Sequence, residues 1–513
     1  MVSTNNSDID VVKNFLHTPE SIETSELVTA LGIMNISLDG SNFEQKMQNI
    51  LSVIPLTSIF TLLGSVNKAV TSVTCKILDK LLRPMNYKDI NSSGLEEYLI
   101  IGLQFDSPEV RILSLHQIEK SLESEEAIQD LIKSPLFPKA LECLGYDDIP
   151  TSTKVSDFFI KLANTSDSGL QALFNSESVA ILKRLSEGNE TIKFRVFDLI
   201  ARISTSSSEA FQLCISTGAL DSITSELNSD DLLVRLNAVE TFSKIIQSKS
   251  GYYFLERSGI IKSLVDYLTQ DDDKDIVLVL VKSASLKFFG KLSEIEEVDF
   301  SEVENKYKIL TQLDAHLLSD NLELKTTTIS VIGMIGHNPL GLKLLYNCTS
   351  PNILSHFMDL YHSSTGEVKL ICMQTISCLI GTSDSSTDEI DNITEQIYQQ
   401  IGGYPTPLKT LMINAKVTIE EVRIANFAIM QEIASHPWGK IEMSRSKEFI
   451  DYVLNRTTES THKGKEWKYS IVQNLHSNSG TLIAPNVLER LRKYLSEGPF
   501  YVRTTTIVAL ESG

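Results

Sequence analysis

Length, composition and charge exclude several classes of protein before any motif is considered. With 14 prolines and 24 glycines among 513 residues, the chain has little room for long disordered linkers, and its 42% hydrophobic and 22% charged residues are typical of a soluble folded protein. The net charge of −20 opposes nucleic-acid binding, because counter-ion release needs a basic face.

The chain shows no targeting or membrane signal. The longest aliphatic run, residues 276–281, is far shorter than the roughly 20 residues that span a bilayer. The first ten residues are polar and acidic, unlike a secretory signal, and the six cysteines form no CxxC pair. We therefore expect a cytosolic or nuclear protein with no membrane segment and no disulfide framework.

A basic residue recurs along the chain at nearly constant spacing. These marker positions are Lys68, Arg111, Lys154, Arg195, Arg235, Lys282, Lys325, Lys369, Arg423 and Lys468. The steps run from 40 to 54 residues with a mean of about 44, which is the period of HEAT and armadillo units. Apolar residues recur one position before most markers, and four and seven positions after them, so they lie on one side of a helix.

Each marked helix thus has an apolar stripe that it cannot bury alone, and stacking of successive units would bury it. The sequence therefore predicts an all-α fold, an α-solenoid of HEAT/armadillo-like repeats wound into a curved superhelix. We expect a single solenoid over residues 1–513: an N-terminal cap (1–60, with a mostly helical stretch at 43–63 interrupted by Pro55), about ten repeats (61–478), and a C-terminal helix and tail (479–513).

A second pattern lies between successive markers. Short apolar segments, most with a glycine, occur at residues 169–174, 210–214, 251–255, 341–345 and 438–441, and each is followed by a break and another apolar stretch. Each unit is therefore predicted to contain a short helix, a longer helix and the marked helix. The pattern does not decide between the HEAT and armadillo forms.

Three segments depart from the repeat. The 54-residue step contains an acidic, serine-rich stretch, predicted to be a loop of about ten residues at 382–391. Residues 271–275 are interpreted as a solvated turn. After a helix at about 485–495, the β-branched tail from Gly498 is predicted to be extended or disordered.

Catalytic motifs are missing from the sequence. Gly-Lys pairs at 290–291, 439–440 and 464–465 lack the following Ser/Thr of a phosphate loop, and no HExxH occurs. Residues 381–385 lack the second glycine of a nucleophile elbow. The nine histidines are scattered, without partners at metal-ligand spacing. We predict no catalytic residue, metal or cofactor, and no enzymatic activity.

The basic markers have two interpretations. They could line a groove that binds an acidic partner. Alternatively, they could fix the register of the repeats, because several follow an acidic residue five positions earlier: Asp106, Glu190, Asp230 and Asp320. Such an acid could cap the next helix and pair with the basic side chain of its own or the next unit. We favour the second interpretation, the structural one, in which the markers fix the register of the repeats.

The predicted binding surface lies on the opposite side of the marked helices, which we expect to line the concave face. The candidate protein-binding residues are Asn237, Glu240, Lys244, Lys287, Lys291 and Gln374. The alternative for each is an ordinary solvated side chain.

Several segments resemble one family, the 26S proteasome non-ATPase regulatory subunit 5 proteins, which are chaperones for regulatory-particle assembly. The resemblance is carried by residues 491–502, by 436–438 with 449–453 downstream, by 287–290 and by 110–118. It covers nearly the whole chain, although little in the first 60 residues matches.

The resemblance implies a non-catalytic chaperone. It would bind the C-terminal domain of an AAA ATPase subunit, regulatory subunit 7, on its concave face while the base of the regulatory particle is assembled, and would block premature docking to the core particle.

Other classes of α-solenoid fit the sequence less well. An armadillo-type transport adaptor would show repeated Trp and Asn residues on the inner helix, whereas the only tryptophans are Trp438 and Trp467. A general α-solenoid scaffold fits the fold but none of the specific segments.

Overall fold

The computed structural model describes residues 6–39, 42–270, 272, 274–382 and 387–501, and these residues form 33 α-helices and no β-strand. The all-α repeat fold predicted from the spacing is therefore confirmed. The chain divides into two compact units, residues 1–226 and 227–513. Whether they continue as one curved superhelix stays a prediction.

Unit 1 contains sixteen α-helices among its described residues. They are α1 (Asn6–His17), α2 (Thr24–Ser37), α3 (Phe43–Val53), α4 (Leu56–Thr61), α5 (Lys68–Leu82), α6 (Tyr87–Ser92), α7 (Glu96–Leu103), α8 (Pro108–Glu119), α9 (Glu125–Lys133), α10 (Leu136–Glu142), α11 (Ile149–Thr165), α12 (Asp167–Leu173), α13 (Ser176–Ser186), α14 (Glu190–Ser204), α15 (Ser208–Ser216) and α16 (Ala219–Ser225).

Unit 2 contains the remaining seventeen α-helices of the described chain. They are α17 (Leu232–Ile245), α18 (Lys249–Arg257), α19 (Ile260–Leu268), α20 (Ile276–Ser293), α21 (Phe300–Tyr307), α22 (Ile309–Leu317), α23 (Leu322–His337), α24 (Pro339–Asn347), α25 (Ile353–Ser363), α26 (Gly366–Ile380), α27 (Asp388–Ile401), α28 (Pro407–Asn414), α29 (Glu420–Ile433), α30 (Pro437–Arg445), α31 (Lys447–Leu454), α32 (His462–His476) and α33 (Pro485–Glu497). Short 3-10 turns lie at Pro19–Ser21, Leu62–Gly64, Lys120–Glu123, Cys143–Gly145, Glu226–Asn228 and Arg456–Thr458.

The repeat has three helices, which is the armadillo form. A short first helix and a second helix precede the marked third helix, as in α9–α11 of unit 1 and α18–α20 of unit 2. The short apolar segments predicted to be first helices form α12, α15, α18, α24 and α30. No single helix among the described residues is long and apolar enough to cross a membrane, and the bent pair Phe43–Val53 and Leu56–Gly64 meets that test only by length and composition.

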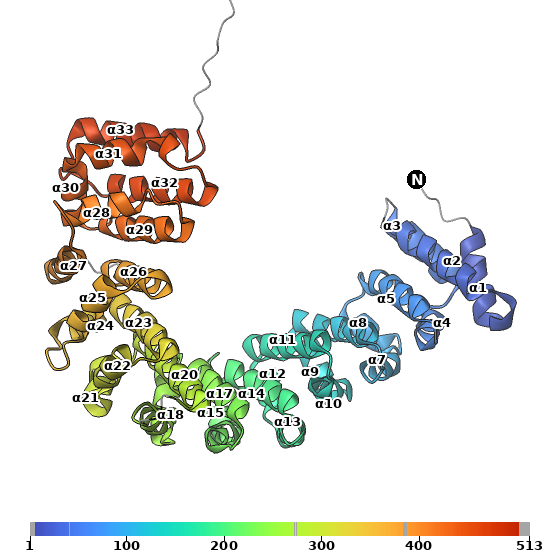
Figure 1. Cartoon of the computed structure of the whole chain (residues 1–513). Coiled ribbons are helices and arrows are strands. Elements are labelled where there is room, and N and C mark those ends of the chain that lie inside the picture. Colours follow the sequence, from blue (N-terminus) through green and yellow to red (C-terminus); the bar gives the residue numbers. More distant parts are fainter. Residues whose placement is uncertain (1–5, 40–41, 271, 273, 383–386, 502–513) are drawn as a thin grey trace, which may run out of the picture. The chain divides into compact units, whose positions relative to one another are not determined.

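The third helices of unit 2 pack in series and form one continuous layer, which we call the inner row: α17, α20, α23, α26, α29 and α32 (Figure 1). The first helices α18, α21 and α24 lie on the other side of the unit. The apolar stripe predicted from the markers is buried inside unit 2. Its members in unit 2 are Val239, Phe242, Leu286, Phe289, Ile329, Ile332, Met373, Ile376, Phe427, Met430, Val472 and Leu475.

Glycine recurs in the first helices because the backbone of the preceding third helix lies against them. A Cβ added to Gly251, Gly341 or Gly439 would lie 1.8, 2.0 or 1.9 Å from the last carbonyl oxygens of α17, α23 or α29. No other residue fits at that distance. The glycine in these segments therefore sets how closely the first helix of one repeat approaches the third helix of the previous repeat.

The acidic insertion is shorter than the predicted ten-residue loop. Thr387 caps α27 and accepts a hydrogen bond from the Ile390 amide, so residues 388–391 form the first turn of that helix. Acidic side chains favour this position because the helix N-terminus carries partial positive charge. Residues 383–386 lie outside the described residues, and so does the tail from residue 502.

Candidate protein-binding surface

Six of the basic markers bond the backbone of their own or a neighbouring repeat. Their side-chain nitrogens donate to carbonyl oxygens in or just after the last turn of a second helix: Arg111 to Phe105, Arg195 to Asp147, Lys282 to Gln270, Lys369 to Tyr361, Arg423 to Thr418 and Lys468 to Asn455. The last carbonyls of a helix lack partners within the helix and carry partial negative charge. Five of these cations therefore hold a third helix against the second helix of the same repeat, whereas Arg195 on α14 reaches the segment after α10, the second helix of the preceding repeat. Both arrangements support the structural interpretation of the markers.

Lys468 shows the cost of this arrangement. Its side chain is 1% exposed, and its ammonium donates to the Tyr452 and Asn455 carbonyl oxygens at 3.0 and 2.7 Å and to the Thr458 hydroxyl. Burial lowers the pKa of Lys468 to about 7, and Glu459 nearby opposes that shift.

The prediction that these acidic residues cap the marked helices is wrong, in most cases by one position. The caps are Asn189, Asp231 and Asn321, each adjacent in sequence to a predicted acid, and Asp106 precedes Ser107, which makes no side-chain cap bond. The reason is geometric: the cap must directly precede the first helical residue so that its oxygen reaches the free amides.

Pairing with the next repeat does occur, with other acids. The Arg111 guanidinium lies 2.6 Å from Asp148, the N-cap residue of α11, and 4.0 Å from the Tyr146 ring. Arg423 pairs with the buried Glu459 at 3.0 Å. Burial opposes ionisation of Asp148 and Glu459, but hydrogen bonds from Thr151 and Thr461, respectively, together with the paired arginine, hold the pKa of each carboxyl below its ordinary value.

The six candidate binding residues all lie on the inner row. Asn237, Glu240 and Lys244 belong to α17, Lys287 and Lys291 to α20, and Gln374 to α26. Glu240, Lys287, Lys291 and Gln374 are exposed, and the other two are half-buried. α20 and α26 are packed on both flanks and from behind, so their exposed side chains at mid-helix lie on the open side of the row. Their role in binding stays a prediction.

Two lines of residues cross the row. Glu240, Lys287, Ser330 and Gln374 each follow their marker by five positions, and Lys244, Lys291, Met334 and Cys378 follow theirs by nine. The structure therefore brings five of the six predicted residues into register across four successive helices, whereas Asn237, two positions after its marker, lies on neither line. It also adds Ser330, an exposed residue that the sequence reasoning passed over.

Exposed aliphatic side chains at one edge of the inner row were not predicted from the sequence. Leu233, Ile276 and Leu322, at or next to the N-terminus of α17, α20 and α23, are 62%, 75% and 55% exposed. Successive third helices run in the same direction, so these side chains share an edge. Their positions do not match the spacing of the buried stripe. That mismatch is the sequence signal that could have identified them as exposed. Neighbouring exposed aliphatics are typical of protein interaction surfaces.

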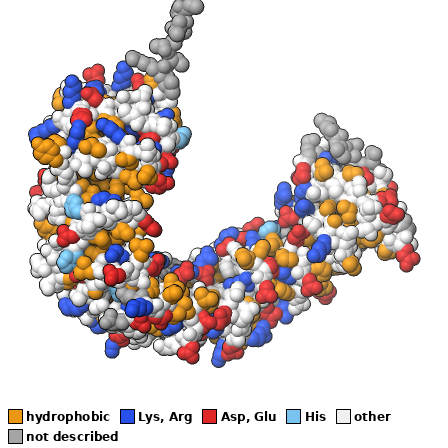
Figure 2. Space-filling model, in the orientation of Figure 1, with side chains coloured by type: hydrophobic (Ala, Val, Ile, Leu, Met, Phe, Trp, Pro, Cys, Tyr) orange, Lys and Arg blue, Asp and Glu red, His pale blue; other side chains and the backbone are white. Residues whose placement is uncertain are grey.

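The visible faces of both units mix positive, negative and hydrophobic side chains without a field of one sign (Figure 2). Among the described residues there is no group of three or more His, Cys, Asp or Glu side chains that could hold a metal ion. The inner row therefore offers apolar contacts at one edge and charged and polar side chains at its centre, an arrangement suited to binding another protein.

A repeat of three helices with an inner row of this kind defines an armadillo-type solenoid, the class of protein that presents long surfaces to protein partners. Residues 10–513 match the family described as "Proteasome non-ATPase 26S subunit". The chain belongs to this family, and the resemblance predicted from the sequence is confirmed.

Curated relatives agree with this assignment. The chain is 27% identical over 466 residues to the human 26S proteasome non-ATPase regulatory subunit 5, covering 89% of this chain and 90% of that protein. It is 22% identical to the Drosophila melanogaster protein of the same name, covering 85% and 84%. An uncharacterized Schizosaccharomyces pombe protein is 25% identical, covering 47% and 46%.

Solved structures that are similar to this chain include designed repeat proteins. A designed armadillo repeat protein in complex with the peptide (KR)4 is 16% identical, with a TM-score of 0.32, and covers 47% of this chain and 99% of that one. An engineered protein covers 82% of this chain and 98% of its own, with 16% identity and a TM-score of 0.37.

Proposed function

We propose that this protein is a non-catalytic chaperone for assembly of the base of the 26S proteasome regulatory particle. It binds the C-terminal domain of an AAA ATPase subunit, regulatory subunit 7, and blocks premature docking to the core particle. The observation that carries the proposal is family membership over residues 10–513, because the relatives are named as non-ATPase regulatory subunits of the 26S proteasome. The proposal includes a cytoplasmic or nuclear location, which microscopy of the tagged full chain tests.

The inner row supports this role. Its apolar edge, Leu233, Ile276 and Leu322, supplies area for a hydrophobic contact, and the charged lines through Lys287 and Lys291 supply orientation. A bound domain prevents a second partner from using the same surface through simple overlap. Release then requires a competitor that binds the ATPase domain more favourably in the next assembly state.

The test uses the full chain and separately purified C-terminal domains of the regulatory-particle ATPase subunits. The immobilised chain is expected to retain the domain of regulatory subunit 7, and core particle added to this complex is expected to remain unbound. Equal retention of every ATPase domain, or recovery of core particle with the complex, would contradict the proposal.

A matched pair of variants locates the surface. Leu322 on α23 of the inner row and Leu340 on α24 are 55% and 65% exposed, so Leu322→Arg and Leu340→Arg are equally tolerable to the fold. Leu322→Arg is expected to weaken binding by about tenfold or more, as truncation of an interface anchor does. Leu340→Arg should bind like the unmodified chain. Identical affinities for the two variants would place the interface elsewhere.

A further inference from the structure

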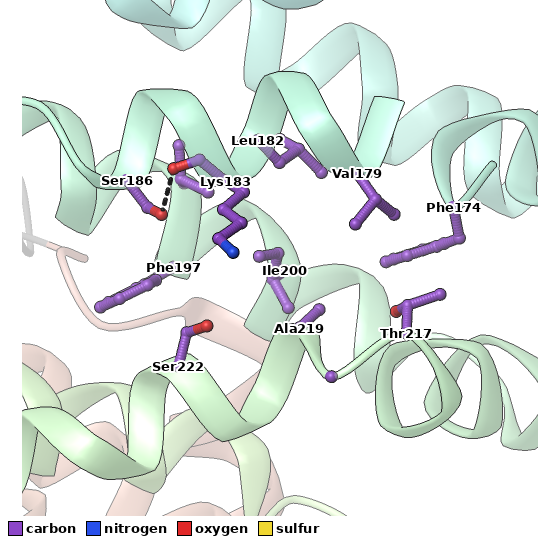
Figure 3. Close-up of a pocket in the computed structure, with 12 residues that line it drawn as sticks. Phe174, Val179, Leu182, Lys183, Ser186, Phe197, Ile200, Thr217, Ala219 and Ser222 are labelled. Atoms are coloured by element: carbon purple, nitrogen blue, oxygen red, sulfur yellow. Dashed lines mark hydrogen bonds between the residues drawn. The ribbon is translucent and has the colours of Figure 1, made fainter. Parts of the chain in front are cut away.

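A cavity of about 190 Å³ lies in unit 1 between α13, α14 and the turn that joins α15 to α16 (Figure 3). Phe174, Leu182, Val196, Phe197 and Ile200 form its walls and are nearly buried. The turn and the start of α16 contribute only small residues to the opposite side: Thr217, Gly218, Ala219 and Ser222. The result is an apolar hole that opens to solvent beside Lys183.

The hole exists because α16 begins with a small residue. Second helices α10, α19, α22 and α25 begin with buried Leu136, Ile260, Ile309 and Ile353. α16 begins with Ala219, which follows Gly218 with φ 70° just as Ile260 follows Gly259 with φ 77°. The backbone geometry is therefore the same, and only the side chain that would fill the space is replaced by a methyl group.

The size of the cavity limits its occupant. It is only slightly larger than the 150 Å³ apolar cavity that holds one benzene, and it is smaller than pockets that hold drug-sized ligands or cofactors. One bulky aromatic or aliphatic side chain fits. Insertion of a single anchor side chain into a preformed pocket is how many protein interfaces obtain most of their affinity.

The positive charge of Lys183 at the mouth of the cavity favours an acidic residue next to the inserted side chain. Lys183 is exposed and extends from α13 toward α16 over the opening (Figure 3), and no acidic side chain lines the cavity. Neighbouring cations are engaged: Arg184 with Glu142, Lys193 with Glu226, and Arg202 with Asp157. The Lys183 ammonium makes no hydrogen bond or ion pair with any other described residue. A carboxylate beside the anchor would complement it.

We propose that this cavity is a second docking site, which takes a bulky apolar side chain flanked by acidic residues in a segment of a partner protein. The site lies on the second-helix layer of unit 1 and is separate from the inner row of unit 2, so it extends the proposed function rather than restating it. The anchor fills the space left by Ala219, and the flanking carboxylate pairs with Lys183.

The test is fluorescence anisotropy with the full chain and the labelled peptide Gly-Asp-Phe-Glu-Gly. We expect saturable binding, and binding at least about tenfold weaker for Gly-Asp-Ala-Glu-Gly, because the buried ring is lost. Gly-Lys-Phe-Lys-Gly should also bind more weakly. Equal binding of the acidic and basic peptides would overturn the proposal.

Three variants make the test specific. Ala219→Ile fills the cavity and is expected to abolish peptide binding while the melting temperature is unchanged or raised. Ala180→Ile places the same side chain at an exposed position of α13 and should bind normally. Lys183→Glu should reverse the preference and favour the basic peptide.

Two further outcomes would overturn the proposal. If Ala219→Ile binds the acidic peptide as well as the unmodified chain does, the cavity is not the site. If 3-phenylpropionate binds as tightly as the peptide, the cavity holds small carboxylates and not a protein segment.

Discussion

The third helices of unit 2 and the second helices at the end of unit 1 are packed very differently. In α20, α23 and α26, glycine allows direct contact: a Cβ on Gly290 would lie 2.8 Å from the Met334 sulfur, and one on Gly336 would lie 2.1 Å from a Leu379 methyl. Between α13 and α16, a cavity of about 190 Å³ is left open. One repeat pattern thus produces both a tightly packed row and a gap.

The difference lies in which residues the repeat constrains. Positions in the third helices face neighbours on both flanks, so a change in volume there is transmitted along the stack. The first residue of α16 borders a cavity, and Ala219 is tolerated there although Leu or Ile begins α10, α19, α22 and α25. We infer that the tight row maintains the fold, whereas the looser layer is free to acquire binding sites.

The largest expected effect comes from a charge in the tight row. Phe289→Asp would bury an uncompensated carboxylate at a fully buried position of α20, and we expect a loss of about 5 kcal/mol or more with unfolding of adjacent repeats. Lys287→Asp, on the exposed side of the same helix, should change stability by less than about 1 kcal/mol. Circular dichroism during denaturant titration measures both. Equal stability of the two variants would show that the stripe is assigned to the wrong side.

A second prediction concerns the pH dependence of the buried Lys468. Its pKa of about 7 in the folded chain is below its ordinary value of 10.5, so the folded state releases the proton first as pH rises. The cost of burying the charge is fully present below about pH 7 and is relieved between pH 7 and 10.5.

The unmodified chain should therefore gain about 2 to 3 kcal/mol relative to Lys468→Met between pH 6 and pH 9. Denaturant melts of both proteins at each pH provide the measurement, because groups common to both cancel in the difference. A constant difference across this range would contradict the lowered pKa.

Adding one methyl group to the tight row should be unfavourable. Gly336→Ala places a Cβ against the fully buried Leu379, and we expect a loss of about 1 to 2 kcal/mol from overpacking. Leu379→Ala in the same chain should make the added methyl neutral or favourable. Gly32→Ala in α2 meets no atom within 4 Å and should stabilise the chain by up to about 1 kcal/mol through helix propensity alone. If thermal melts show a higher melting temperature for Gly336→Ala than for Gly32→Ala, the contrast between tight and open positions is wrong.

The smallest expected effect is in the looser layer. Ala219→Ile should stabilise unit 1 by about 1 kcal/mol, as cavity-filling substitutions commonly do. Its melting temperature should exceed that of the unmodified chain, whereas Ala180→Ile, at an exposed position, should leave it unchanged. A clear loss of stability would mean that the cavity cannot accept the side chain.

The repeat period and the buried stripe could be predicted because burial repeats in register with the markers. Phe242, Phe289 and Ile332 are fully buried, as their position seven residues after a marker required. Three helices per repeat were predicted, but the choice between the HEAT and armadillo forms could not be made, because the short first helices are defined by local contacts such as that of Gly251 with the end of α17.

The functional surfaces were only partly predictable. Lys287 and Gln374 were chosen because polar residues opposite a buried stripe must face outward, and both are exposed. The exposed Leu322 was missed because an apolar residue near a helix start is assigned to the core by default. The cavity at Ala219 could not be seen at all, since an empty space depends on the distance between helices.

The most direct test of the central claim is site-specific photo-crosslinking of the full chain to the C-terminal domain of regulatory subunit 7. A photoreactive phenylalanine replaces Gln374 on the inner row in one protein and Leu340 on α24 in another. We predict a cross-linked product from position 374 and none from position 340. A product from position 340 alone would show that the partner binds the opposite layer of unit 2.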